Sequence, residues 1–201
     1  LVADVPMDDK DTKGDIYEYM LGKIASAGQN GQFRTPRHII KMIVELMQPK
    51  PTDTICDPAC GTAGFLVAAS EYLNDHYSTE IFANPEAAKR FSEETFFGYD
   101  FDSTMLRIGS MNMMLHGVEN PSIENRDSLS EAHSHIAEKY SLILANPPFA
   151  GSLDNESCAK NIQAVVKTKK TELLFLALFL RLLKTGGRAA VIVPDGVLFG
   201  S

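Results

Sequence analysis

Short apolar segments alternate along the chain with longer segments of helical periodicity, and this alternation restricts the possible folds more than any other feature. The expected strands are residues 54–56, 96–99, 122–125, 142–145 and 189–193, and the helices between them are residues 64–77, 103–116, 130–139 and 172–183. Strands that alternate with helices in this way build parallel sheets. The sequence therefore predicts an α/β fold, with a mostly parallel sheet and helices on both of its faces.

Three further segments lie outside this alternation. Thr35 followed by Pro36 predicts a helix that starts here and ends before Pro49, because threonine is a favoured N-cap and proline suits the first helical position. Residues 84–94 are expected to form an extra helix that begins with Asn-Pro. The polar stretch 151–171 is expected to be a mobile loop.

The two ends of the chain predict a fragment of a longer protein. The chain begins without methionine and stops directly after an apolar run. We therefore expect a fold truncated at its C-terminal end. Residues 1–30 are expected to be a helical lead-in from a missing N-terminal region, with one short helix at 15–24, and residues 31–201 an incomplete main domain.

Composition limits the class of protein to which the chain belongs. Its 201 residues are 44% hydrophobic, which is enough for one well-packed domain. A formal net charge of -7 disfavours binding of nucleic acid by bulk electrostatics, since that requires clustered Lys and Arg. The longest apolar segment, 173–183, contains Arg181 and is too short to cross a bilayer, so no membrane partner is expected. Three irregularly spaced cysteines suit a reducing, cytoplasmic compartment and predict no metal site.

Carboxylates stand at the ends of three successive predicted strands: Asp57, Asp100 and Asp127. Parallel sheets bind ligands outside the carboxyl ends of their strands, near the point where strand order reverses. Asp100 is placed to accept both hydroxyl groups of a ribose, and Asp127 to accept a hydrogen bond from an exocyclic amine. Each could equally be an ordinary residue at the end of a strand or the cap of a helix. Together the three carboxylates favour a ligand site.

The turn after the first predicted strand is built from small residues. It consists of Asp57, Pro58, Ala59, Cys60, Gly61, Thr62, Ala63 and Gly64. Gly61 and Gly64 permit a tight turn and close approach of the backbone to a ligand. The dinucleotide fingerprint Gly-x-Gly-x-x-Gly is absent, and Asp57 favours a ligand with an ammonium or sulfonium group over a pyrophosphate. A strand-to-helix turn that merely uses small residues is the alternative.

An Asn-Pro-Pro-Phe segment follows the fourth predicted strand. Asn146 supplies a side-chain carbonyl oxygen that can accept a hydrogen bond from an aromatic amine. Pro147 and Pro148 lack N–H groups and hold the neighbouring carbonyls in a rigid turn. Phe149 offers a face on which a planar base can stack, a contact worth about 1–3 kcal/mol. This combination predicts alkylation of an amino nitrogen, with a simple turn as the alternative.

These motifs together resemble the S-adenosylmethionine-dependent DNA adenine-N6 methyltransferases, and most closely the modification (M) subunit of type I restriction–modification systems. Residues 111–117 and 186–199 are also similar to that family. The order of the motifs, with a Gln-Phe-x-Thr-Pro segment ahead of the cofactor loop, adds specificity. The sequence departs from the family at Arg34, where an aromatic residue is commoner, and at Ala63, where glycine is usual.

The resemblance implies a Rossmann-like methyltransferase fold, with residues 31–201 as the catalytic domain and S-adenosyl-L-methionine as the cofactor. The implied catalytic residues are Asn146, Pro147, Pro148 and Phe149, and the implied cofactor-binding residues are Gln32, Phe33, Arg34, Thr35, Pro36, Arg37, Asp57, Pro58, Gly61, Thr62, Ala63, Gly64, Asp100 and Asp127. Thr35 and nearby N–H groups at a helix start are expected to receive the cofactor's carboxylate.

The activity implied by the resemblance is methylation of the N6 amine of an adenine flipped out of double-stranded DNA. The implied partners are a DNA-specificity subunit and a restriction subunit. Two alternatives remain at this stage. One is a methyltransferase that acts on protein glutamine, RNA or cytosine N4. The other is a non-catalytic module that keeps the cofactor pocket for a structural role.

Overall fold

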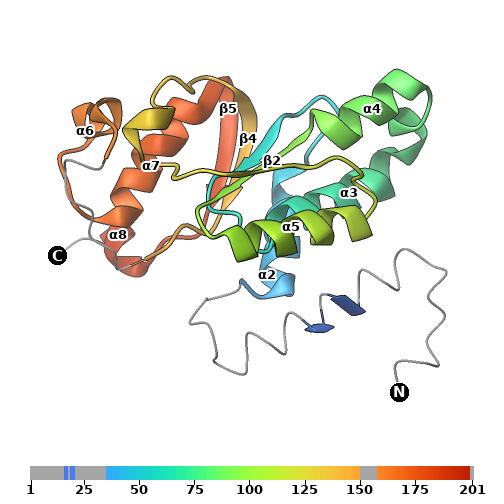
Figure 1. Cartoon of the computed structure of the whole chain (residues 1–201), viewed down its shortest axis with the longest axis horizontal. Coiled ribbons are helices and arrows are strands. Elements are labelled where there is room, and N and C mark those ends of the chain that lie inside the picture. The colour runs from blue at the N-terminus through green and yellow to red at the C-terminus, as the bar shows by residue number, and fades with distance from the viewer. Residues whose placement is uncertain (1–15, 18, 21–34, 150–157, 200–201) are drawn as a thin grey trace.

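Five parallel strands form one sheet through the centre of the molecule, in the order β3-β2-β1-β4-β5 (Figure 1). The computed structural model describes residues 16–17, 19–20, 35–149 and 158–199. The strands are β1 (Ile55–Asp57), β2 (Phe96–Asp100), β3 (Ser122–Asn125), β4 (Tyr140–Ala145) and β5 (Leu183–Val191). The parallel α/β fold predicted from the alternation is confirmed.

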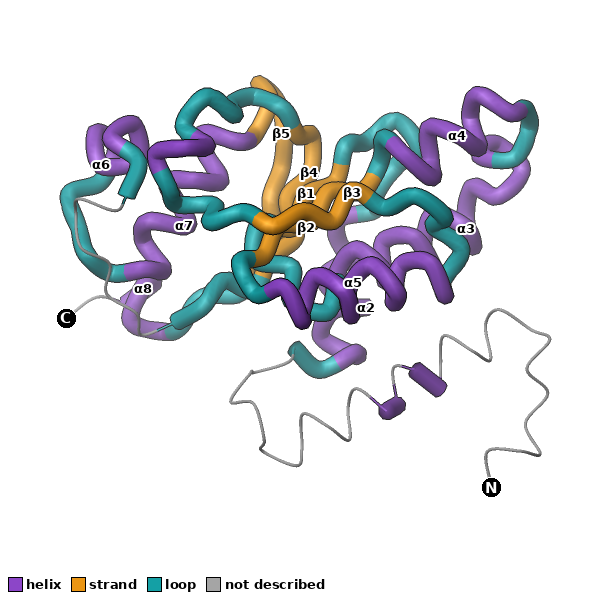
Figure 2. Tube along the Cα trace, in the orientation of Figure 1, coloured by secondary structure: helices purple, strands orange, loops and turns teal. Residues whose placement is uncertain are grey.

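Helices cover both faces of this sheet (Figure 2). One face carries α2 (Arg37–Met47), α3 (Gly64–Ile81), α4 (Pro85–Glu93) and α5 (Ser103–Leu115). The opposite face carries α6 (Lys160–Val165) and α7 (Thr171–Leu182). A short helix, α8 (Asp195–Phe199), follows β5. The sheet is therefore the middle of three layers, which leaves the ends of its strands as the places where side chains can meet a ligand.

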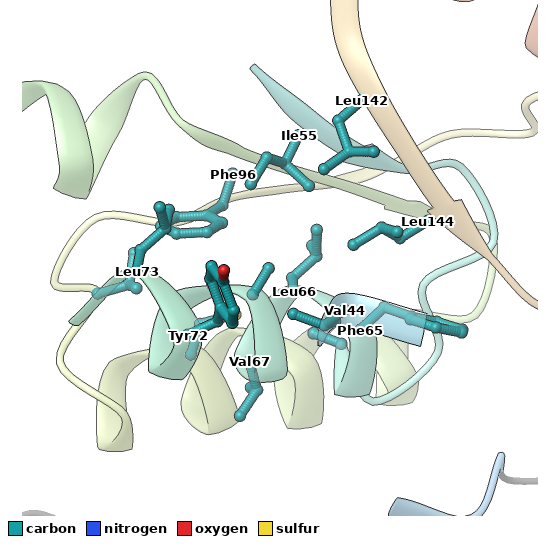
Figure 3. Close-up of a cluster of buried hydrophobic side chains, with 14 of the residues drawn as sticks. Val44, Ile55, Phe65, Leu66, Val67, Tyr72, Leu73, Phe96, Leu142 and Leu144 are labelled. Atoms are coloured by element: carbon teal, nitrogen blue, oxygen red, sulfur yellow. The ribbon is translucent and has the colours of Figure 1, made fainter. Parts of the chain in front are cut away.

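Alternation of side chains along the strands builds one hydrophobic cluster on each face. Leu142 and Leu144 of β4 lie in the cluster with Leu66 of α3 and Phe96 of β2 (Figure 3). Ile143 points the other way and packs in the cluster with α7. Burying one such side chain contributes about 1.5–3 kcal/mol. The central strands are thus held from both sides, which fixes the positions of their carboxyl ends.

The helix predicted at 130–139 is wrong. Only Glu131–His133 form a short 3₁₀ turn, and the chain then runs without regular structure to β4. The backbone N–H groups of Glu138 and Lys139 donate to the last carbonyls of α7, at 2.8 and 2.9 Å. Because these N–H groups donate to carbonyls at the end of α7, they are not available for hydrogen bonds within a helix at 130–139.

The loop predicted at 151–171 is wrong in part, because Lys160–Val165 form α6, whereas residues 166–169 have no regular structure. Cys158, Ala159 and Ile162 are buried. These apolar residues recur at helical spacing on either side of the exposed Lys160, so they can cover one face of the sheet while this charge faces solvent. Residues 150–157 lie outside the described residues.

Strand β5 begins six residues earlier than expected. Leu183 pairs with Tyr140, but the next pair is Arg188 with Leu142, so the intervening residues bulge out of the register. Gly186 has a φ of 78° in this bulge, a value that favours glycine. The alternating pattern in the sequence marked only the regular part of the strand.

The extra helix predicted at 84–94 is confirmed as α4. The side chain of Asn84 caps it by accepting a hydrogen bond from the Ala87 N–H at 2.9 Å, and Pro85 occupies the first helical position. In the lead-in, residues 16–17 and 19–20 are helical, as expected.

Candidate active site

The strand order of the sheet reverses between β1 and β4. From β1 the sheet grows through β2 to β3 on one side, whereas β4 and β5 lie on the other. Ligands of open parallel sheets bind outside the carboxyl ends of the strands at such a reversal. Asp57 ends β1 and Asn146 directly follows β4, so these two residues stand on either side of the point where a ligand is expected.

The turn after β1 is fixed by its own backbone and by β2. The Cys60 N–H donates to the Tyr99 carbonyl at 2.9 Å, and the Ala63 N–H donates to the Cys60 carbonyl at 2.7 Å. Gly61 and Ala63 both have positive φ, at 51° and 61°. That conformation costs alanine roughly 1–2 kcal/mol. A Cβ on Gly61 would meet nothing within 4 Å, so this side of the turn is open to a ligand.

Helix α5 braces the same turn from behind, which sequence reasoning missed. The buried Asn112 side chain donates from Nδ2 to the Thr62 carbonyl at 2.9 Å. One helical turn earlier, a Cβ on Gly109 would lie 3.0 Å from the Gly61 carbonyl oxygen, so only glycine allows this approach. The available signal was a glycine and an asparagine at i, i+3 in a helix rich in large apolar residues.

Helix α2 also approaches the turn closely. A Cβ on Gly64 would lie 3.1 Å from Cδ1 of Ile40, a buried residue of α2. On the other side, the buried Pro58 carbonyl accepts a hydrogen bond from the Ser128 hydroxyl at 2.7 Å. The predicted cofactor loop is therefore held at both of its ends by distant segments.

Asp100 lies at the end of β2 and contacts the turn directly. Its Oδ2 accepts from the Gly61 N–H at 3.0 Å, and its Oδ1 accepts from the Asp102 N–H at 2.9 Å. A carboxylate has about four acceptor positions, so two remain after these bonds are made. Asp100 can thus hold the turn and still accept hydrogen bonds from the hydroxyl groups of a ribose.

Asp57 is a buried carboxyl group with one hydrogen-bond donor near it. Burial raises its pKa from 3.8 to about 7, the Ala59 N–H at 3.0 Å opposes that rise, and the nearby Asp100 adds to it. Near neutral pH the group is therefore shared between its charged and uncharged forms. A ligand with a positive charge favours the ionised form, because it replaces solvation that burial removes.

Asp127 lies two residues beyond β3 rather than at its end. It is exposed, and its Oδ1 accepts from the Leu129 N–H at 3.1 Å. This bond is the local turn that an aspartate forms with its own backbone. The structure joins Asp57, Asp100 and Gly61 into one group but gives Asp127 no bond to that group, so its cofactor role stays a prediction.

The tip of β4 is joined by a hydrogen bond to Thr35, two residues before α2. Nδ2 of Asn146 donates to Oγ1 of Thr35 at 2.8 Å, and Oδ1 of Asn146 is buried with no hydrogen-bond partner among the described residues. The predicted cap at Thr35 is wrong, because α2 begins at Arg37 after Pro36 and no side chain caps it. The hydroxyl group that sequence reasoning assigned to the helix instead bonds the Asn146 amide.

The rest of the Asn-Pro-Pro-Phe segment leads away from the core. Pro147 is buried against the protein, and Pro148 is exposed. The Phe149 side chain is 41% exposed, which is high for so large an apolar ring. This exposed ring, three residues after Asn146 in the sequence, offers a face on which a planar base could stack.

Other predicted cofactor residues are less closely tied to this group. Arg37 lies 3.5 Å from Oε1 of Glu71, in the second turn of α3. Gln32, Phe33 and Arg34 lie outside the described residues. Their roles remain predictions.

These residues fit a nucleoside cofactor that carries a positive charge. The open space at Gly61 admits a ligand beside the turn, and Asp100 retains acceptor positions for a ribose. The buried carboxyl of Asp57 suits a cation. The orphaned Oδ1 of Asn146 is an acceptor for an amine. The carboxyl groups of Asp57 and Asp100 therefore suit S-adenosylmethionine, and the oxygen of Asn146 suits the amino group of a second substrate.

The described residues contain no cluster of three or more His, Cys, Asp or Glu side chains that could hold a metal ion. No helix in the described part of the chain is long and apolar enough to cross a membrane. All three cysteines are buried and unbonded to one another.

The reversed strand order, the acidic strand tips and the Asn-Pro-Pro-Phe segment define a nucleotide-cofactor-binding α/β domain of the methyltransferase type. The sequence profile of the N-6 DNA Methylase family matches residues 8–201. The chain belongs to this family.

Named relatives agree with this assignment. The chain is 38% identical over 188 residues to the methylase subunit of the type I restriction enzyme EcoEI from Escherichia coli, which covers 93% of this chain and 37% of that subunit. It is 32% identical over 197 residues to the EcoKI methylase subunit of E. coli K12, covering 94% of the chain and 36% of the subunit.

Solved structures give the same result. A modification subunit assigned to a type I restriction enzyme from Vibrio vulnificus YJ016 has a TM-score of 0.80 at 30% identity, covering 98% of this chain and 42% of that one. The M protein of EcoKI has a TM-score of 0.74 at 29% identity, covering 86% and 36%. The chain thus spans about two fifths of the length of these relatives.

Proposed function

We propose that the protein transfers a methyl group from S-adenosyl-L-methionine to the N6 amine of a flipped-out adenine in DNA, as the modification subunit of a type I restriction–modification complex. Residues 31–201 are its catalytic domain. The observation that carries the proposal is the Asn146 amide at the tip of β4, whose buried Oδ1 has no partner among the described residues and which precedes the exposed ring of Phe149.

The cofactor supplies a methyl group activated by a positively charged sulfur. Asn146 Oδ1 accepts one N–H of the adenine amine, which orients the nitrogen lone pair toward that methyl group. The adjacent carbonyl of Pro147 accepts the other N–H, and Phe149 stacks on the flipped base. The new nitrogen–carbon bond forms as the sulfur–carbon bond breaks, and the amine then loses one proton to solvent.

Asp57 and Asp100 bind the other substrate in this scheme. Asp57 faces the positive charge of the amino-acid part, and Asp100 accepts the ribose hydroxyls while it holds Gly61 in place. Neither group takes part in bond making. Rate enhancement therefore comes from position and from the electrostatic environment, without a covalent intermediate on the protein.

The partners follow from charge and from the relatives. A net charge of -7 provides no broad basic surface for DNA. The relatives are named as subunits of type I restriction enzymes. We therefore propose that a specificity subunit supplies sequence recognition, that a restriction subunit joins the same complex, and that the complex works in the cytoplasm on double-stranded DNA.

The proposal is tested by methyl transfer in the assembled complex of the full-length protein and its specificity subunit. Tritiated cofactor is supplied with a duplex that contains the recognised adenine, or with the same duplex in which purine, which lacks the N6 amine, replaces it. We expect label only with adenine, and at least a 100-fold loss in Asn146→Ala. Asn120→Ala removes an exposed asparagine far from the strand tips and serves as the matched control.

Other outcomes point elsewhere. Label on cytosine, RNA or protein with intact adenine would assign a different amino acceptor. Cofactor binding without transfer to any acceptor, unchanged by Asn146→Ala, would indicate a non-catalytic module.

A further inference from the structure

One hydrogen bond ties the reacting end of the site to the start of α2. Asn146 and Thr35 are 111 residues apart in sequence, yet Nδ2 of the first lies 2.8 Å from Oγ1 of the second. Oδ1 of the same amide has no partner among the described residues. The amide is thus held by its nitrogen, and its oxygen is left for another donor.

A threonine hydroxyl can hold an amide in two ways, since it has one proton and two acceptor lone pairs. When Thr35 accepts from Nδ2, the Asn146 oxygen is free to accept from a substrate amine. When Thr35 donates to Oδ1, the amide turns over and presents its own N–H groups to that amine. Two donors then face each other, and no hydrogen bond forms. Only the first orientation supports methyl transfer.

The group to which the Thr35 hydroxyl donates its hydrogen bond decides between these orientations. In the productive orientation the hydroxyl must donate to an acceptor other than Asn146, and no described residue accepts this hydrogen bond. At the start of α2, Pro36 has no N–H, and the N–H groups of Ile39 and Ile40 donate to the Pro36 carbonyl at 3.0 and 3.1 Å. The His38 N–H, by contrast, has no carbonyl partner among the described residues. An anionic ligand group beside this end of the helix would accept from the backbone and from Thr35 together.

S-adenosylmethionine carries one such group, the carboxylate of its amino-acid part. Once that carboxylate accepts a hydrogen bond from the Thr35 hydroxyl, the hydroxyl can no longer donate to Oδ1 of Asn146. It can only accept from Nδ2. Cofactor binding therefore fixes the amide in the orientation that the substrate amine needs.

We propose that Thr35 is a positioning residue that couples the two substrates: its hydroxyl donates a hydrogen bond to the cofactor's carboxylate and thereby holds Asn146 with Oδ1 directed at the adenine amine. This inference rests on the proposed function. It also gives a reason for the cofactor to bind before the adenine, since an adenine that binds first meets an Asn146 amide whose orientation is not yet fixed.

The test measures how much the N6 amine contributes to binding in the full-length protein with its specificity subunit. Two duplexes carry either adenine or purine at the target, each opposite an abasic position so that pairing energies cancel. Binding is measured with S-adenosylhomocysteine, which keeps the carboxylate but has no methyl group to transfer. We expect the wild type to prefer adenine by roughly a hundredfold, as two buried hydrogen bonds provide, one to Oδ1 of Asn146 and one to the Pro147 carbonyl.

The variants separate the hydroxyl group from the shape of the side chain. Thr35→Val keeps the shape and removes the hydroxyl, so the preference for adenine should fall to about tenfold, which the hydrogen bond to the Pro147 carbonyl still provides. Thr35→Ser restores the hydroxyl and should recover most of the preference. A further arm replaces S-adenosylhomocysteine with 5′-methylthioadenosine, the same thionucleoside without the amino-acid part that carries the carboxylate. The wild-type preference should then fall as it does in Thr35→Val.

Each contrary result has one meaning. A full preference for adenine in Thr35→Val overturns the positioning role, and an equal preference with both nucleosides overturns the coupling to the carboxylate. If wild-type complex does not methylate adenine, the proposed function fails and the inference falls with it. Methylation that is intact in the wild type and equal in Thr35→Val overturns the inference alone.

Folding is checked separately. Thermal melting of each variant identifies loss of structure, and Thr35→Ala replaces Thr35→Val if the latter melts early, with the same expected loss of preference. Thr185→Val, at an exposed position in β5, is the matched control and should keep the wild-type preference.

Discussion

Replacing Asp57 by asparagine should stabilise the cofactor-free protein, and the gain should grow with pH. Asp57 is buried, and its pKa is raised from 3.8 to about 7 by that burial, with a further contribution from Asp100. Asparagine has the same shape and keeps an oxygen to accept from the Ala59 N–H, the bond that Oδ1 of Asp57 makes at 3.0 Å. The substitution therefore removes the ionisation and little else.

The size of the effect follows from the two pKa values of Asp57. The folded protein holds one proton more than the unfolded chain between about pH 4 and pH 7, so the free energy of unfolding falls as pH rises through this window. Three pH units at 1.36 kcal/mol each give about 4 kcal/mol in total. Between pH 5 and pH 8 the titration of Asp57 lowers the free energy of unfolding by about 3 kcal/mol. The Asp57→Asn variant has no such titration and should not lose this stability.

Urea denaturation, followed by far-ultraviolet circular dichroism without cofactor, measures the effect. The difference in unfolding free energy between Asp57→Asn and wild type should increase by about 3 kcal/mol from pH 5 to pH 8. All other titrating groups cancel in this difference. Asp75→Asn, at an exposed position of α3, controls for the loss of one negative charge. A difference that stays flat across this range would falsify the buried, partly protonated state of Asp57.

Three further predictions concern the same site and the core beneath it. Cofactor affinity should be about tenfold weaker at pH 6 than at pH 8, because Asp57 must lose its proton to face the cofactor's cation, and calorimetry of Asp57→Asn should show no such pH dependence. Asn112→Ala should lower cofactor affinity by about tenfold, since it frees the Thr62 carbonyl from its brace; equal affinity in a folded variant would refute this role. Tyr99 and Tyr140 share a hydrogen bond between their buried hydroxyls, so either single change to phenylalanine should cost about 1–3 kcal/mol and the double change less than the sum, as a double-mutant cycle would measure.

Local patterns in the sequence were enough to predict the sheet and its strand tips. Alternating apolar segments gave five strands, and the positions of Asp57 and Asp100 at strand ends were confirmed. The helix predicted at 130–139 failed because its last backbone donors bond α7 instead. The loop predicted at 151–171 failed at Lys160–Val165, which form α6, where Ile162 is buried against the face of the sheet that carries α7.

Within the candidate site, sequence reasoning named the residues at the strand tips but not the contacts between them. Thr35 was expected to cap α2, and the structure gives its hydroxyl to Asn146. Asn112 lies in the segment 111–117, to which sequence reasoning gave no role. In the structure its side chain donates a hydrogen bond to the Thr62 carbonyl in the turn after β1. Such contacts join segments far apart along the chain, so the local periodicity of apolar residues does not indicate them.

The sequence by itself determined the alternation of strands and helices, the acids at the strand tips and the Asn-Pro-Pro-Phe segment, because backbone geometry and side-chain periodicity act over a few residues. Only the tertiary structure decided that burial raises the pKa of Asp57 to about 7, and that the amide of Asn146 is held by a residue 111 positions away in the sequence. Burial and long-range hydrogen bonds depend on how the layers pack, and packing exists only once the whole sheet and its helices have assembled.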